Sequence, residues 1–115
     1  MAELQEFMFL FRYSPNLEHT PTKEELAQQE KDWGAFIGKM AAQAKLVNVY
    51  QLDVQGVVQH SDLSEPAQMY VAENMAVGGT MVVKATDIAE AVTLSKLCPI
   101  FKIGGSVEIH PIIPM

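Results

Sequence analysis

The fold is decided by residues 78–111, which read GGTMVVKATDIAEAVTLSKLCPIFKIGGSVEIHP. The pair Gly78-Gly79 leads into an apolar strand, and Asp87-Ile88-Ala89-Glu90 is a capping-box pattern that begins a helix. Cys98-Pro99 ends this helix, and Gly104-Gly105 precedes a final strand in which apolar and polar residues alternate. The last third of the chain therefore predicts a strand, a helix and a strand in succession.

The N-terminal half predicts another strand and another helix. Residues Glu6–Arg12 form a nearly continuous apolar run, which is typical of a central strand covered on both faces. Thr22 can cap a helix and Glu25 can reach back to it, and we expect this helix to run to about Lys45. Its apolar residues recur at helical spacing and predict one buried stripe, made of Leu26, Trp33, Phe36, Ile37, Met40 and Ala44.

Shorter strands are predicted between this helix and the first glycine pair. Leu46–Leu52 alternates between apolar and polar residues and reads as a strand. After Asp53, residues Val54–Gln59 predict the returning arm of a hairpin with that strand. A polar loop follows, and Ala67–Val71 predicts a short extra strand.

The order β-α-β-β-α-β predicts an α+β domain of the ferredoxin-like kind, spanning residues 1–115, with both helices on one face of an antiparallel sheet. In the last strand Val107 and Ile109 then point to one face, and Ser106, Glu108 and His110 to the other. The first strand is apolar on both faces, so the face without helices needs a cover. A second copy of the chain is the simplest cover, which predicts a homodimer.

Composition excludes several classes of partner. The 115 residues carry a net charge of −6, with seven scattered lysines and Arg12 as the sole arginine. Nucleic-acid binding needs clustered positive charge, so no nucleic-acid partner is expected. No apolar run reaches the roughly 20 residues that span a membrane, and with one cysteine and no signal-peptide pattern a cytoplasmic location is expected. The glycine pairs lack the helix start of a phosphate loop, and no cofactor is predicted.

Three histidines are the first candidates for acid-base chemistry. His110 lies on the outward side of the last strand, where an interface or surface role is the simpler interpretation. His60 lies in a polar loop near Asp62, and His19 lies in the loop after the first strand. Their spacing forms no metal motif, so no metal site is predicted.

Arg12 is the most informative polar residue, because it follows a buried strand, where an unpaired charge is costly. With Tyr13 beside it, Arg12 can clamp a carboxylate on a ligand. Alternatively it pairs with Glu108, because the exit of the first strand lies near the start of the antiparallel last strand. Arg12, Tyr13 and Glu108 are the candidate ligand-binding residues, and Glu108 is also a candidate catalytic residue with the histidines.

Two further residue types have structural interpretations. Cys98 lies at the C-terminal end of a predicted helix, where the helix dipole disfavours a thiolate, so a buried and unreactive thiol is expected. Gly34 and Gly38 are spaced for close helix packing. The glycine pairs are expected to serve turns and bulges.

The chain resembles the YCII-related family, in the subgroup that carries a DGPF motif. The order of Gly-Gly, helix, Cys-Pro and Gly-Gly-Ser-Val-Glu is shared. Trp33, Phe36-Ile37-Gly38 and Gln43-Ala44-Lys45-Leu46-Val47 look like the end of the family's first helix, an aromatic pair followed by Gln-Gly-Lys-Leu-Val, so about two thirds of the chain is covered. The resemblance implies a ferredoxin-like domain that dimerises sheet to sheet into a dimeric α/β barrel. The DGPF tetrad falls on Ala67-Gln68-Met69-Tyr70, and a histidine used by a better-known branch falls on Trp33.

The chain thus lacks the Asp, Gly and Pro of the DGPF motif and the histidine at Trp33, and we therefore do not expect it to have inherited a catalytic activity. We expect a homodimer that binds a small anionic metabolite in a cleft near the exit of the first strand. The alternative is an isomerase- or lyase-like enzyme acting on a small organic acid, with Arg12, Tyr13, His19 and Glu108 around the cleft. A further alternative is a non-catalytic protein-interaction dimer, which a cleft filled by Met8, Leu10, Met69 and Tyr70 would favour.

Overall fold

The computed structural model describes residues 3–14, 21–53, 55–68, 71 and 75–115. They form a four-stranded antiparallel sheet in the order β2-β5-β1-β6 and a two-stranded sheet, β3-β4. In chain order the elements are β1 (Gln5–Tyr13), α1 (Lys23–Ala42), β2 (Leu46–Gln51), β3 (Val57–Val58), β4 (Ala67–Gln68), β5 (Ala76–Ala85), α2 (Ile88–Ser95), the 3-10 helix η1 (Pro99–Ile103) and β6 (Ser106–Pro111).

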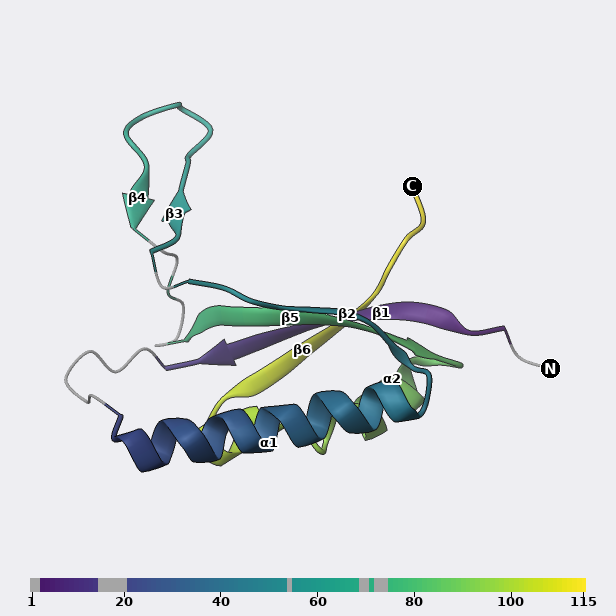
Figure 1. The fold of residues 1–115 in the computed structure, drawn as a ribbon. Helices are drawn as coiled ribbons and strands as arrows, with labels where there is room; N and C mark the ends of the chain where they lie inside the picture. Colours follow the sequence, from purple (N-terminus) through teal and green to yellow (C-terminus); the bar gives the residue numbers. More distant parts are fainter. Residues whose placement is uncertain (1–2, 15–20, 54, 69–70, 72–74) are drawn as a thin grey trace.

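The predicted α+β class is confirmed, and the sheet is compatible with a ferredoxin-like fold. Both helices lie on one face of the four-stranded sheet, and no other layer covers the opposite face of the described chain (Figure 1). Within the described ranges, no helix combines the length and hydrophobicity needed to cross a membrane.

Strand β1 lies between β5 and β6 and divides its side chains between the two faces, as its alternation predicts. Phe7, Phe9 and Phe11 are buried against the helices. Met8 and Leu10 are half-buried on the open face, where their Cα partners in β6 are His110 and Glu108. The predicted parity of the last strand is therefore confirmed as well.

Helix α1 is anchored by an aromatic chain of contacts. The Trp33 ring stands edge-on to the rings of Phe11 in β1 and of Phe36, with distances of 5.1 Å and 6.0 Å between ring centroids. Met40 is fully buried. The predicted capping box is present, since Thr22 Oγ1 accepts from the Glu25 N–H. The predicted stripe was too long, because Leu26 is 48% exposed near the start of the helix, where the sheet no longer lies beneath it.

Helix α1 also ends earlier than the predicted Lys45. Gln43 is its C-cap, and Ala44 has a φ of 56°, in the left-handed region. The Ala44 N–H donates to the Ala41 carbonyl and the Lys45 N–H to the Met40 carbonyl, which is the hydrogen-bond pattern of a Schellman motif. Ala44 has therefore left the helix and does not extend its apolar stripe.

The interpretation of Val54–Gln59 as an arm paired with the second strand was wrong. Val57 and Val58 pair with Gln68 and Ala67 of β4, and together β3 and β4 make a separate ribbon. This ribbon and the C-terminal residues after β6 both rise on the open side of the large sheet (Figure 1). Of the predicted strand Ala67–Val71, residues 69 and 70 lie outside the described residues.

The close helix packing predicted at Gly34 and Gly38 was also wrong. Both glycines are exposed, and a Cβ added at either would meet no atom within 4 Å of the described chain. Helix α1 turns this side to solvent because Trp33, Phe36, Ile37 and Met40 all lie on the side that packs against the core.

Candidate functional site

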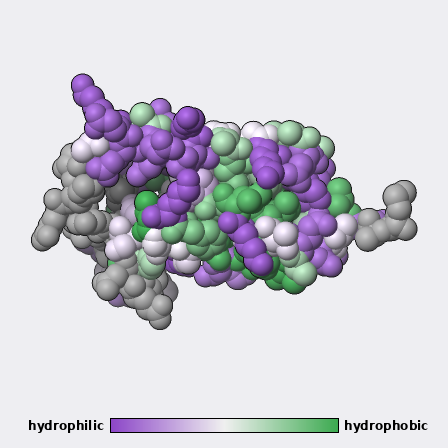
Figure 2. Space-filling model, turned by 90° about the horizontal axis from the view of Figure 1, so that it is seen from below, coloured by the Kyte–Doolittle hydropathy of each residue, from purple (hydrophilic) through white to green (hydrophobic). Residues whose placement is uncertain are grey.

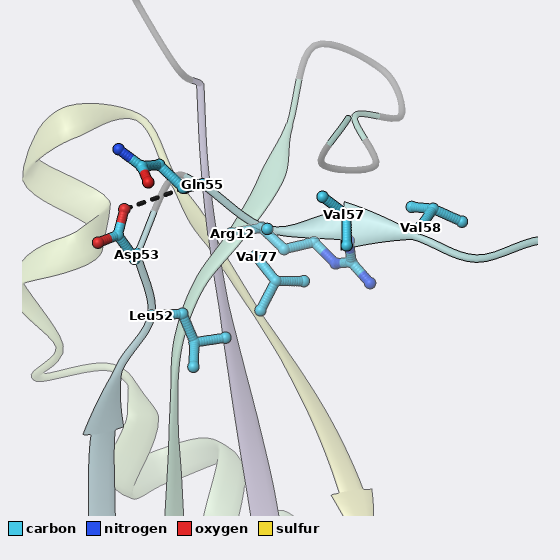
Figure 3. Close-up of a pocket in the computed structure, with 8 residues that line it drawn as sticks. Arg12, Leu52, Asp53, Gln55, Val57, Val58 and Val77 are labelled. Atoms are coloured by element: carbon cyan, nitrogen blue, oxygen red, sulfur yellow. Dashed lines mark hydrogen bonds between the residues drawn. The ribbon is translucent and has the colours of Figure 1, made fainter. Parts of the chain in front are cut away.

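A pocket of about 520 Å³ lies where β1 leaves the sheet, between the sheet and the β3-β4 ribbon (Figure 3). We call it the Arg12 pocket. Its lining comes from β1, β5, the segment after β2 and the start of the ribbon, and consists of Arg12, Leu52, Asp53, Gln55, Gly56, Val57, Val58 and Val77. The exit of the first strand is thus hollowed, and of its eight lining residues only Arg12 was predicted to line a site.

The glycine pairs position Arg12. The register of β1 against β5 shifts after Phe11, which pairs with Gly79, so that Arg12 pairs with Val77 and Gly78 is passed over. A side chain at Gly79 would come within 2.8 Å of the Tyr50 carbonyl oxygen of β2. A side chain at Gly105 would collide with the Arg12 carbonyl on the other edge of β1. Glycine is therefore needed where the strands bring their backbones together, which agrees with the predicted bulge role.

Arg12 pairs with Glu108, so the predicted alternative of an internal ion pair is present. The Arg12 Nη2 atom lies 3.3 Å from Glu108 Oε1, and the Arg12 side chain is 27% exposed. The other Glu108 oxygen, Oε2, is in close contact with His110 Nε2. Three residues that alternate on the open face of β1 and β6 are thereby joined into one charged network, which we call the Arg12-Glu108-His110 network.

This network lowers the pKa of Glu108. The hydrogen bond from His110 is the largest cause, and the positive charge of Arg12 adds to it, while partial desolvation opposes both. Glu108 is therefore ionised at neutral pH. Among the described residues Glu108 is the one partner of the Arg12 side chain, and that contact is not bidentate. A guanidinium has five N–H donors, so Arg12 has donors available for a second anion.

The opposite end of the Arg12 pocket is held by a turn after β2. The Gln55 N–H donates to Asp53 Oδ1 at 3.0 Å, and the Leu52 N–H donates to the Gly78 carbonyl at 3.0 Å. Between the two ends the wall is aliphatic, with Leu52 44% exposed and Val57 68% exposed. In Figure 3 the Arg12 side chain passes behind Val57, while the Asp53 carboxylate points away from Leu52 and Val77.

The remaining predicted site residues lie elsewhere. Tyr13 packs against the core, and its ring covers Gly78, so that a Cβ on Gly78 would lie 2.7 Å from the Tyr13 Cδ1 atom. Tyr13 is thus turned to the helix side, away from Arg12. His60 is exposed in the ribbon loop, where its carbonyl accepts from the Leu63 N–H, and it does not line the pocket. His19, Met69 and Tyr70 lie outside the described residues.

A second hollow, of about 250 Å³, lies on the helix-covered side between α1 and η1. In Figure 2 hydrophobic residues are visible on this side between groups of hydrophilic ones. The Lys102 Nζ atom lies 3.1 Å from Asp32 Oδ2 at this hollow. Hydrogen bonds from Gln28 and Lys102 lower the pKa of Asp32. The pair ties η1 to α1, which is a structural role.

Cys98 is buried, with 3% of its surface exposed, and burial raises its thiol pKa to about 11. Across the described parts of the chain, no three His, Cys, Asp or Glu side chains gather closely enough to hold a metal ion.

The comparisons with known proteins add no relative: no protein-family model matches the chain, and no curated protein does.

Proposed function

We propose that this protein binds a small anionic metabolite in the Arg12 pocket, with the guanidinium of Arg12 as the charge anchor. The observation that carries the proposal is that the one arginine of an acidic chain lines a hollow whose wall is mainly aliphatic. Aliphatic side chains beside a guanidinium lower the local dielectric constant, which strengthens its charge-assisted hydrogen bonds to a carboxylate. Few polar groups on an apolar wall are typical of small-molecule sites.

Glu108 and a ligand do not compete for the same atoms in this arrangement. Glu108 takes one donor at Nη2 of Arg12 and stands on the sheet side of the guanidinium, on β6. The pocket lining contains Val57 and Val58 of β3 and does not contain Glu108. Glu108 thus orients the guanidinium, and the ligand takes the donors that Glu108 leaves.

Thermal unfolding with a panel of small carboxylates tests the proposal. A carboxylate that binds the folded state raises the melting temperature in proportion to its saturation. Arg12→Met should remove this increase, whereas Glu108→Gln should keep it, because the guanidinium remains. Lys84→Met is the matched control, since Lys84 is an exposed cation of β5 outside the pocket. If no carboxylate stabilises the parent protein, and Arg12→Met and Glu108→Gln are equally less stable, Arg12 is only structural.

The second part of the proposal is a homodimer formed on the open face of the large sheet, as in a dimeric α/β barrel. Its support is the apolar centre of that face, where Met8 and Leu10 of β1 neighbour Val82 and Thr80 of β5. The β3-β4 ribbon and the C-terminal residues rise at opposite ends of this face (Figure 1). Such a trough suits a second copy, which should bury more than about 1,000 Å² in total.

Light scattering at micromolar concentration measures the mass of the protein in solution and so tests for the dimer. We expect twice the chain mass of 12.7 kDa. Leu10→Lys should shift the protein to the monomer, because it places a charge in the apolar centre of the face. Leu26→Lys is the matched control, since Leu26 is exposed on α1 on the other side of the molecule. A parent protein of 12.7 kDa refutes the dimer.

We further propose that the chain is a divergent, cytoplasmic member of the YCII-related family. The support is the set of shared motifs in residues 33–47 and 78–108, together with a sheet order compatible with the fold that the resemblance implies. The location rests on the sequence, which has one cysteine.

The alternative function, an isomerase- or lyase-like enzyme acting on a small organic acid, has one observation in its favour. Glu108 joins Arg12 to His110, which places an imidazole two residues from the carboxylate that orients the proposed anchor. His110 does not line the Arg12 pocket, so a ligand must extend past Glu108 along β6 before this base can remove a proton from it. If so, the carbon-bound proton of a stabilising acid should exchange with deuterium in heavy water, and His110→Gln should slow the exchange. Unchanged proton spectra leave the non-catalytic functions, ligand binding or a protein-interaction dimer.

A further inference from the structure

We infer that the ligand of the Arg12 pocket is an aliphatic monocarboxylate, an acid with one negative charge and an alkyl body. This inference rests on the proposed function and names its ligand class. It follows from what the described lining offers, which is the cation of Arg12 beside the aliphatic side chains of Leu52, Val57, Val58 and Val77.

The aliphatic side chains favour an alkyl body. Leu52 and Val57 are 44% and 68% exposed, and they line the same hollow as Val77 of β5 (Figure 3). Methyl groups in contact with water are unfavourable. An alkyl body that lies on these side chains removes their surface from water, whereas a ligand that is polar along its length does not.

One cation favours one anionic group on the ligand. Among the described residues that line the pocket, Arg12 is the only cation, and Glu108 already pairs with it. The other charged residue of the lining is Asp53, itself an anion, whose carboxylate points away from Leu52 and Val77 in Figure 3. A second negative group on the ligand therefore meets apolar side chains in a chain of net charge −6, which disfavours dicarboxylates.

A phosphate monoester is disfavoured for the same reason and by the elements that form the lining. It carries more than one negative charge at neutral pH. Helix N-termini are common phosphate sites, but none of the described lining residues belongs to a helix. A carboxylate needs only the parallel N–H donors that one guanidinium presents.

Val57 of β3 is the lining residue that should contribute most to the preference for an alkyl body. It is the most exposed aliphatic side chain of the described lining, so it has the most apolar surface for a ligand to cover. Val57→Thr replaces one methyl group by a hydroxyl at nearly the same size. Val47→Thr is the matched control, because Val47 is an exposed valine of β2, 40% exposed, that does not line the pocket.

NMR titration of the backbone amides of the full chain tests the inference, with acetate, butanoate, hexanoate, hexanedioate and butyl phosphate as probes. We expect the Gly56 and Val77 amides to shift, and the affinity to rise roughly two- to fourfold with each methylene added between acetate and hexanoate. Hexanedioate and butyl phosphate should bind roughly fivefold or more weakly than hexanoate. Val57→Thr should reduce the gain from butanoate to hexanoate, and Val47→Thr should leave it unchanged.

The possible results separate this inference from the proposed function. If acetate and hexanoate bind equally, or if hexanedioate or butyl phosphate binds most tightly, and Arg12→Met abolishes the binding, the anion site stands and the ligand class is wrong. If Val57→Thr and Val47→Thr keep the same dependence on chain length, the alkyl body does not lie on β3, which also overturns the class. If no probe binds the parent protein, or if Arg12→Met binds every probe as the parent does, the inference and the proposed function are both wrong.

Discussion

Replacing Ala44 with glycine should stabilise this protein. Ala44 follows the C-cap of α1 with a φ of 56°, and the two hydrogen bonds of the Schellman motif hold it there. In this left-handed conformation a Cβ crowds the backbone, which costs roughly 1–2 kcal/mol. Glycine removes that strain and loses about 0.5–1 kcal/mol more backbone entropy on folding. The net expectation for Ala44→Gly is a gain of about 1 kcal/mol in the free energy of unfolding.

The gain is large enough to measure. At about 2.1 cal/mol/K per residue, a chain of 115 residues unfolds with an entropy near 0.24 kcal/mol/K, so 1 kcal/mol raises the melting temperature by about 4 °C. Thermal unfolding measures the shift in melting temperature, and urea titration measures the change in the free energy of unfolding. Ala35→Gly is the matched control, because Ala35 is exposed inside α1, where glycine costs about 1 kcal/mol. If Ala44→Gly lowers stability as much as Ala35→Gly does, Ala44 is helical and α1 continues to Lys45.

Three further predictions concern other features of the fold. Gly34→Ala and Gly38→Ala should each raise the free energy of unfolding, measured by urea titration, by about 1 kcal/mol, because alanine favours the helix. A Cβ at either position meets nothing within 4 Å in the described chain. A loss of stability would show that this side of α1 is covered. Cys98 should react far more slowly with a thiol reagent in the native protein than in denaturant. The reason is that burial raises its pKa from 9.0 to about 11, which reduces the fraction of thiolate about 100-fold at pH 8. Equal reaction rates would contradict the burial of Cys98. The difference in melting temperature between the parent protein and Glu108→Gln should be largest at neutral pH and should shrink as the pH falls below 4.5. The reason is that a carboxyl group with a lowered folded-state pKa stabilises the fold only while it is ionised. A difference that does not change down to pH 3 would show that Glu108 and His110 do not interact.

Much of the candidate site was predictable because its charged residues lie on regular strands. The alternation of β6 places Glu108 and His110 on one face, and the antiparallel pairing of β1 with β6 brings Arg12 beside Ser106 and within reach of Glu108. Both conclusions need only the period of a strand and the topology of the fold. The rest of the pocket was not predictable in this way, since Asp53, Gln55 and Gly56 lie between β2 and β3, where local hydrogen bonds and not periodicity decide the path. The turn-forming order of Asp53 before Gln55-Gly56 was the one signal of a bend there.

The sequence by itself determined the elements and the face that each residue takes within them. Apolar period, caps and glycine pairs are local properties, and they specify β1, α1, β5, α2 and β6 without reference to distant residues. Only the tertiary structure decided three other features: β3 pairs with β4, Ala44 adopts the left-handed conformation, and the ribbon encloses a hollow against Arg12. The hollow depends on contacts between β1 and the segment after β2, which lie far apart in the chain, and the β3-β4 pairing and the Ala44 conformation depend on hydrogen bonds that the apolar period does not predict. Such contacts compete with local preference through packing and hydrogen bonds that no single stretch of sequence contains.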